Sequence, residues 1–253
     1  VLAAPRERRG AALAAPEPAG GGDAVTALLS AEGITKSFGA TRALSGVTLS
    51  IAPGEPVGLF GPNGSGKTTL VNILSGLLLP DAGKVRFDGK EITRLPLDAR
   101  YRLGIARTFQ IPHPYPALSV REAVRVALVV HPGIRTEGEG PRGGEEGPIE
   151  DLLARTGLFN QRFVPCSLLS QGCLRRLEFA RALACRPKLL ILDEIFSALS
   201  AADEEDLLAL LRAANREEGT AILLVSHNPP LLKSVCRRIL VLEEGRIVRE
   251  RKV

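Results

Sequence analysis

The sequence predicts an α/β fold with a mainly parallel sheet, and three observations support this prediction. Short apolar runs of strand length alternate with segments of helical period along most of the chain. Turns containing glycine or proline separate these segments. The length of 253 residues allows one large core, and the hydrophobic fraction of 45% is ordinary for a soluble globular protein.

The N-terminal segment differs in composition from everything that follows it. Residues 1–24 are rich in Ala, Pro, Gly and Arg, show no periodicity and lack the apolar core of a signal peptide. Such a segment buries too little apolar surface to offset the entropy that it would lose on ordering. We therefore expect a disordered tail over residues 1–27 and a single domain over residues 28–250.

The first half of the domain is predicted to contain several strands and one helix. Strands are expected at residues 34–38, 47–51, 56–60 and 85–87, the last closed into a small hairpin by Asp88 and Gly89. Residues 67–79 switch to a helical period, which places four apolar side chains on one face: Leu70, Ile73, Leu74 and Leu77.

The second half continues the alternation of strands and helices. Residues 131–148 are rich in glycine and charged residues, so we expect a flexible loop there. Helices are expected at residues 170–184 and 202–216, buried strands at 189–192 and 221–225, and a final hairpin at 239–242 and 246–249. Pro187 ends the first of these helices.

Hydropathy, charge and cysteine usage limit the classes of function. No apolar run approaches the roughly 18–20 residues that cross a bilayer. The net charge of +5 could serve nucleic acid or anionic lipid, but it is mild, and a solvated surface is the preferred interpretation. The four cysteines form no C-x-x-C pair, which favours reduced thiols in a cytosolic protein.

A phosphate-binding loop is the strongest motif in the chain. The run Gly61-Pro62-Asn63-Gly64-Ser65-Gly66-Lys67-Thr68 fits G-x-x-x-x-G-K-[ST] at every fixed position. Its glycines let backbone N–H groups wrap the phosphates of ATP, and Lys67 and the helix that begins near it add positive charge. The Thr68 hydroxyl is the expected Mg²⁺ ligand. An apolar strand before the loop and a helix after it argue against a chance match.

Two carboxylates follow the apolar run at residues 189–192. Asp193 and Glu194 cannot lie unpaired inside a buried strand, so we expect them at its C-terminal end, where open parallel sheets bind ligands. There Asp193 would hold Mg²⁺ through water, and Glu194 would polarise the water that attacks the γ-phosphate. Taken alone, the pair is a weak signal, because strands often end in acidic residues.

Three smaller signals each have an ordinary structural explanation. Ser170, within Leu169-Ser-Gln-Gly-Cys173, suits a helix N-cap. Gln110 precedes a proline-broken segment and could be a polar loop residue. His227 follows the strand at residues 221–225, and a lone histidine is more often structural than catalytic.

Together, and in this order, the motifs resemble those of the nucleotide-binding subunit of ABC transporters over about residues 28–250. The resemblance rests on the phosphate loop, Gln110, Ser226-His227 and residues 169–173, 189–194 and 197–200. It implies a P-loop NTPase core with an N-terminal antiparallel β subdomain. It also implies a small helical subdomain at about residues 111–168, which contains the flexible loop.

The resemblance implies that MgATP is bound between two chains. One chain would hold the nucleotide through its phosphate loop, Thr69 included, while Phe38 would stack on the adenine. The alternative for Phe38 is core packing, since strand aromatics are usually core residues. The second chain would reach the γ-phosphate with Ser170 and Gly172 of its signature loop.

The resemblance also implies roles in hydrolysis. Gln110 would sense Mg²⁺ and water and link the site to the membrane partner. His227 would contact the γ-phosphate and steady Glu194, the general base. The chain would thus be an ATPase that powers transmembrane transport.

The implied partners are a second ABC ATPase subunit, identical or not, transmembrane permease subunits and a solute-binding protein, with no nucleic acid. The implied location is cytoplasmic, peripheral on the inner face of the cell membrane. Residues 104–110 and 175–183 are similar to branched-chain amino-acid importer ATPases, which suggests amino-acid import.

Several positions depart from the family pattern. The signature usually reads Leu-Ser-Gly-Gly-Gln, but Gln171 and Cys173 stand here at its third and fifth positions; Ile195 replaces a proline and Ser200 an aspartate. The stretch between Gln110 and Ser170 is also short and rich in glycine. These departures leave open two alternatives. One is a degenerate or regulatory cassette that binds ATP with weak hydrolysis, and the other is a soluble non-transport ABC-class ATPase.

Overall fold

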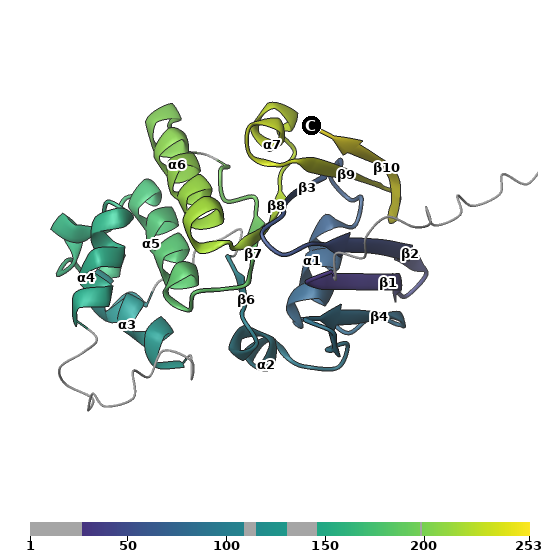
Figure 1. The fold of residues 1–253 in the computed structure, drawn as a ribbon, viewed down its shortest axis with the longest axis horizontal. Coiled ribbons are helices and arrows are strands. Elements are labelled where there is room, and N and C mark those ends of the chain that lie inside the picture. The colour runs from purple at the N-terminus through teal and green to yellow at the C-terminus, as the bar shows by residue number, and fades with distance from the viewer. Residues whose placement is uncertain (1–26, 109–114, 131–145, 198) are drawn as a thin grey trace, which may run out of the picture.

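The computed structural model describes residues 27–108, 115–130, 146–197 and 199–253. An antiparallel sheet lies on one side of a mainly parallel sheet, and most of the helices gather on the other side (Figure 1). The expected tail up to residue 26, Gln110 and residues 131–145 of the expected loop lie outside the described residues.

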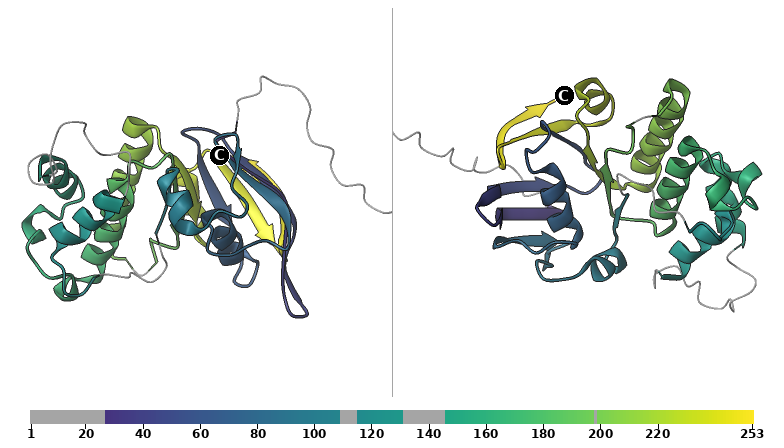
Figure 2. Two further views of the ribbon diagram at one scale, coloured as in Figure 1. Left: turned by 90° about the horizontal axis from the view of Figure 1, so that it is seen from below. Right: turned by 180° about the vertical axis from the view of Figure 1, so that it is seen from behind.

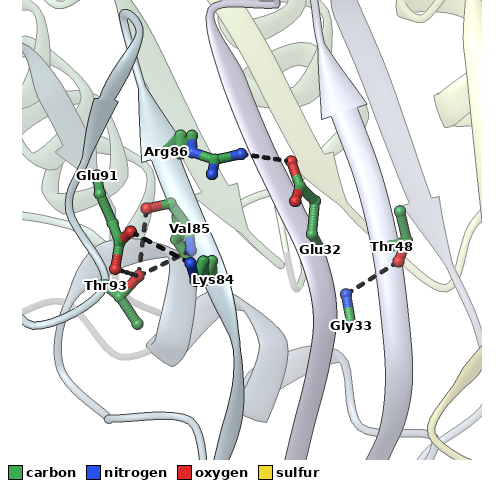
Figure 3. A network of polar contacts seen from close by, with 8 residues as sticks. All are labelled: Glu32, Gly33, Thr48, Lys84, Val85, Arg86, Glu91 and Thr93. Carbon is green, nitrogen blue, oxygen red and sulfur yellow. Dashed lines mark hydrogen bonds and ion pairs between the residues drawn. The ribbon is translucent and has the colours of Figure 1, made fainter.

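The antiparallel sheet has the strand order β2-β1-β4-β5. Its strands are β1 (Leu29–Phe38), β2 (Thr41–Ile51), β4 (Ala82–Phe87) and β5 (Lys90–Glu91). β1 and β2 are longer than predicted, because register shifts such as the one between Ala31 and Ile34 interrupt their alternation. Figure 3 shows polar contacts across this sheet, where Arg86 pairs with Glu32 at 2.9 Å. The predicted N-terminal antiparallel subdomain is confirmed.

The larger sheet has the strand order β10-β9-β3-β8-β7-β6. Its strands are β3 (Pro56–Phe60), β6 (Ile105–Arg107), β7 (Leu189–Asp193), β8 (Ala221–Val225), β9 (Arg238–Glu243) and β10 (Arg246–Lys252). Neighbouring strands are parallel except for the β9–β10 hairpin. The predicted mainly parallel sheet is therefore confirmed, and β3, β8 and β7 end side by side at one edge.

The core has two halves, one on each face of this sheet. Leu190 and Leu192 of β7 belong to the half that packs against the helices, and Leu189 and Ile191 belong to the half shared with the antiparallel sheet. This alternation follows from the two-residue period of a strand, and it explains why a strand buried on both faces is apolar throughout.

The helices cover the two faces of the sheet unequally (Figure 2). They are α1 (Lys67–Ser75), α2 (Leu97–Arg102), α3 (Val120–Val130), α4 (Glu146–Arg155), α5 (Gln171–Ala184), α6 (Ala201–Glu218) and α7 (Pro229–Val235). α1 contacts both β2 and β7, whereas α3, α4 and α5 contact one another in a separate helical layer. Within the described chain, no helix combines the length and apolar character of a membrane span.

Two further predicted boundaries are wrong, one of a helix and one of a loop. The helix predicted at residues 67–79 ends at Ser75, because Gly76 adopts the left-handed conformation with φ 86° and its N–H closes the last turn. Leu77 therefore leaves the apolar face and is 47% exposed. The loop predicted to reach residue 148 ends earlier, since α4 begins at Glu146. Pro148 is tolerated there because N–H groups of a first helical turn have no partner inside the helix.

Candidate functional site

The phosphate loop joins the end of β3 to the start of α1, as the motif requires. Gly64 and Gly66 have positive φ values of 79° and 103°, and a Cβ on Gly66 would lie 2.6 Å from the Ala43 carbonyl oxygen. A Cβ on Gly61 would overlap the Leu242 carbonyl oxygen. Only glycine fits at positions 61 and 66, so the backbone of the loop is fixed by close neighbours.

The polar groups of the loop divide into buried and exposed sets. Lys67 is only 8% exposed, and its Nζ donates to the carbonyl oxygens of Gly61 and Pro62 at 2.7 and 3.0 Å. The buried Ser65 hydroxyl has no hydrogen-bond partner among the described residues. Pro62, Asn63, Gly64 and Thr68 are exposed, and Thr69 is partly buried. These residues of the loop are thus accessible to solvent, whereas the Lys67 ammonium is held by two carbonyl groups.

The acidic residues lie at the same edge of the sheet as this loop. Asp193 is the last residue of β7, Glu194 follows it directly, and His227 lies just after β8, which pairs with both β3 and β7. His227 Nδ1 lies 3.0 Å from Glu194 Oε2. Because β3, β8 and β7 are consecutive in the sheet, the fold brings Lys67, Glu194 and His227 to one edge.

Glu194 has a strained backbone for a residue with a side chain, with φ at 52°. Its N–H donates to the Val225 carbonyl oxygen at 3.1 Å, and its own carbonyl oxygen accepts from the Ser197 N–H and hydroxyl. These bonds hold the backbone of Glu194 in this conformation at the end of the strand. Strain of this kind is concentrated at functional sites.

The structure adds one charged residue that the sequence analysis missed. Arg107, the last residue of β6, donates from Nη2 to Asp193 Oδ2 at 3.0 Å, and both side chains are almost fully buried. Burial lowers the pKa of the Arg107 guanidinium, and Asp193 opposes that shift. The sequence did contain one signal for it. Arg107 ends a short apolar run shortly before Gln110, just as Asp193 ends the apolar run of another strand.

The signature loop, residues 170–173, is held by α5 and α6. Ser170 is the N-cap of α5, as predicted, and its hydroxyl accepts from the Cys173 N–H at 3.3 Å. A Cβ on Gly172 would lie 2.8 Å from Asp203 Oδ1. Asp203 in turn accepts from Ser200 and pairs with Arg176 at 3.0 Å. The loop therefore lies against a carboxylate whose charge Arg176 compensates.

Two further predicted residues have different outcomes. Phe38 lies at the end of β1 and is 52% exposed, with Lys36 Nζ 5.7 Å from the centre of its ring. The core-packing alternative for Phe38 is therefore wrong. Gln110 lies outside the described residues.

The donor chemistry of the site fits Mg²⁺. Thr68 offers a hydroxyl oxygen and Asp193 a carboxylate, the hard oxygen ligands that this cation prefers. α1, which carries Thr68, packs against β7, which ends in Asp193.

Comparisons with known proteins identify relatives over most of the chain. The family model described as "ABC transporter" matches residues 44–197. An uncharacterized ABC transporter ATP-binding protein of Rhizobium meliloti (strain 1021) is 34% identical over 220 residues, which cover 87% of this chain and 78% of that protein. The methionine import ATP-binding protein MetN of Mesorhizobium japonicum is 38% identical over 224 residues, which cover 86% of this chain and 58% of that protein.

Solved structures agree with this result. A nucleotide-free ATP-binding cassette from an ABC transporter superposes with a TM-score of 0.76 at 29% identity, covering 90% of this chain and 92% of that one. A dimeric ATP-binding cassette in a post-hydrolysis state, bound to ADP and Pi, gives a TM-score of 0.78 at 29% identity, covering 88% and 98% of the two chains.

Proposed function

The chain belongs to the ABC transporter family as an ATP-binding, ATP-hydrolysing subunit, and from this premise we propose that it is the motor of an amino-acid importer. The observation that carries the proposed catalytic site is the contact between Glu194 and His227 at the sheet edge that also bears the phosphate loop. This edge combines a cradle for a triphosphate with a carboxylate that can accept a proton from water.

In this proposal the phosphates of ATP bind to residues 61–69. Lys67 carries the one full charge of the loop at residues 61–69, and it would exchange its bonds to Gly61 and Pro62 for the β- and γ-phosphates. Backbone N–H groups of the loop and the N-terminal end of α1 would stabilise the remaining negative charge. The exposed ring of Phe38 would stack on the adenine.

We assign Mg²⁺ to the oxygens of Thr68 and Asp193, with Gln110 as a further group that senses it. When bound, Mg²⁺ neutralises charge on the β- and γ-phosphates during transfer. Glu194 would accept the proton of the attacking water, and the His227 ring, 3.0 Å from Glu194 Oε2, would orient that carboxylate.

The second half of each site would come from another ATPase subunit. Ser170 and Gly172 would lie against the γ-phosphate bound to that subunit, at the exposed N-terminus of α5. A dimeric cassette among the structural relatives supports this arrangement. The ATPase pair would lie at the inner face of the membrane against permease subunits, and a solute-binding protein would be a further partner of the complex.

Amino acids are the proposed class of solute. The resemblance of residues 104–110 and 175–183 favours branched-chain amino acids, whereas several relatives are named as methionine importers. The chain spans about three-fifths of the length of those MetN proteins (58% of one), so methionine remains a proposal too. Uptake of radiolabelled leucine and methionine by cells with and without this chain distinguishes the two solutes. If removing the chain reduces the uptake of neither, the result contradicts import of these amino acids.

The ATPase site is tested by comparing the purified chain with Lys67→Ala. We expect the parental chain to bind and hydrolyse MgATP, and Lys67→Ala to lose binding because the cradle loses its full positive charge. Unchanged melting temperatures show that both chains are folded. Nucleotide binding by Lys67→Ala at the parental affinity contradicts the assignment of the loop.

A regulatory cassette is the second candidate, and the altered signature loop favours it. Gln171, Cys173 and Ser200 replace the residues usual for the family, and all three belong to the half that serves the other subunit's ATP. A purified chain that binds ATP tightly but hydrolyses it only when mixed with a different ATPase subunit would support this candidate.

A further inference from the structure

Arg107 holds three groups from two different elements. Its Nη1 donates to Asn72 Oδ1 at 2.7 Å and to Ser75 Oγ at 3.0 Å, both on α1. Its Nη2 donates to Asp193 Oδ2 at 3.0 Å. The guanidinium therefore bridges the helix that follows the phosphate loop and the strand that ends in the acidic pair.

The surroundings make this bridge specific. The Arg107 and Asp193 side chains are 5% and 4% exposed, so neither charge is well solvated. A buried carboxylate without a partner is unfavourable and tends to turn towards water. A planar guanidinium with donors in a fixed fork holds both partners at defined angles, which a flexible ammonium does not.

A structural role alone does not account well for this arrangement. Buried ion pairs contribute little net stability compared with apolar residues of the same size, because desolvation of the charges offsets their attraction. Arg107 also joins the two elements whose spacing decides how Thr68 and Asp193 face one another, since Asn72 and Ser75 lie on the helix that begins at Lys67. Because Arg107 holds Oδ2, Oδ1 is the Asp193 oxygen that would remain for Mg²⁺.

We propose that Arg107 is a positioning residue for Mg²⁺: it orients the Asp193 carboxylate, and it fixes α1 against that carboxylate. This inference rests on the proposed function, since it assumes that Asp193 serves Mg²⁺. Arg107 would act through Asp193 and α1, which are the groups that it contacts. Groups that orient metal ligands in this way change metal affinity by about 10–100-fold when they are removed.

The test compares Arg107→Met with Arg107→Lys and measures ATP affinity at increasing Mg²⁺ and in EDTA. Met keeps the length of the side chain without its charge. We expect Arg107→Met to raise, by about tenfold, the Mg²⁺ concentration that gives half of the maximal increase in ATP affinity. ATP affinity in EDTA should stay within about twofold, because the phosphate loop is untouched, and Arg107→Lys should recover part of the loss. Arg102→Met, at an exposed arginine of α2 paired with Asp98, is the matched control and should behave like the parental chain.

Two outcomes overturn the inference: a folded Arg107→Met with the parental Mg²⁺ requirement, or an equal loss of ATP affinity in Mg²⁺ and in EDTA. If Arg107→Met does not fold, Asn72→Ala takes its place, because it removes one anchor of the guanidinium and leaves the ion pair. A raised Mg²⁺ requirement of Asn72→Ala supports the inference, and an unchanged one overturns it. A parental chain whose ATP binding ignores Mg²⁺ contradicts the proposed function instead, whatever the variants do.

Discussion

The sheet edge that carries Lys67, Asp193, Glu194 and His227 and the signature loop at residues 170–173 are built in different ways. The sheet edge is fixed by buried parallel strands, and each of its side chains is held by a partner from another element. The signature loop is held by a helix cap and by the Arg176–Asp203 pair near the surface. Departures from the family pattern fall in the second region and beside the first, but not on Lys67, Asp193, Glu194 or His227.

This difference has an energetic basis. Replacing Lys67, Arg107 or Asp193, whose side chains are buried, leaves a polar partner or a charge uncompensated, which costs on the order of several kcal/mol. The pair between Arg176 and Asp203 is only partly buried, so we expect it to contribute less than the buried pair and the fold to tolerate substitutions around it better. We therefore expect the fold to tolerate substitutions in the signature loop better than at the buried part of the sheet edge.

The largest expected effect tests the sheet edge alone. Glu194→Gln should keep ATP binding and lose turnover by roughly two or more orders of magnitude, because the amide cannot accept the proton of the attacking water. Steady-state hydrolysis and ATP affinity are the two measurements. Glutamine preserves the shape of the side chain, so an unchanged melting temperature is the control. Hydrolysis at the parental rate means that Glu194 is not the base.

The next effect tests whether the signature loop acts on nucleotide at all. Ser170→Asp keeps a good N-cap for α5 but adds a negative charge where the γ-phosphate of the other chain should lie. We expect ATPase activity to fall by at least about tenfold through like-charge repulsion. Ser170→Asn, an equally good cap without charge, is the matched control and should retain most of the activity. Gly172→Asp is a poorer probe, since its Cβ would already meet Asp203 within the same chain.

Mixing variants sharpens the same test. Lys67→Ala has a damaged cradle and an intact signature loop, whereas Ser170→Asp has the reverse. If each site is shared between two identical chains, an equal mixture contains pairs with one complete site and partly regains activity that neither variant has alone. A mixture that stays inactive while the parental chain is active contradicts the shared site. An inactive parental chain points to a different partner ATPase.

The parts of the fold that the sequence could predict are those set by local patterns. The strands β3 and β8 begin and end where their apolar runs do, and the Ser170 cap follows from residue type. The position of Asp193 at a strand end also follows, because an acid cannot continue a buried run. These features depend on neighbours in sequence.

The parts that could not be predicted depend on neighbours in space. The pair between Arg107 and Asp193 joins residues 86 positions apart, and no local pattern encodes which strands become adjacent. The contact of Gly172 with Asp203 likewise exists only once α5 and α6 are packed. The early end of α1 is an exception, because its cause, Gly76, is local; periodicity alone treats a single glycine as a tolerated position within a helix.

A smaller effect tests the exposure of the signature loop through its cysteine. Cys173 is partly exposed, whereas Cys166, Cys185 and Cys236 are buried. Burial raises the pKa of Cys185 to about 11 and that of Cys236 to about 12, so their thiolates are scarce near pH 7. We expect maleimide to label Cys173 first, and Cys173→Ser to remove this fast phase. ATP with the Glu194→Gln variant should slow the labelling by trapping the dimer; equal rates with and without ATP place Cys173 outside the interface.

The smallest effect concerns Phe38, which lies in neither region but should contact the same nucleotide. Its ring is 52% exposed at the end of β1, so Phe38→Ala removes little buried area and should leave the melting temperature almost unchanged. Stacking of a base on an aromatic ring is worth about 1–3 kcal/mol, so the dissociation constant for ATP should rise by at least about fivefold. Phe38→Tyr keeps the aromatic face and should bind like the parental chain. Inorganic triphosphate, which has no base, should bind Phe38→Ala and the parental chain equally well. If the alanine variant loses triphosphate affinity too, then Phe38 acts through the shape of the phosphate loop rather than through the base.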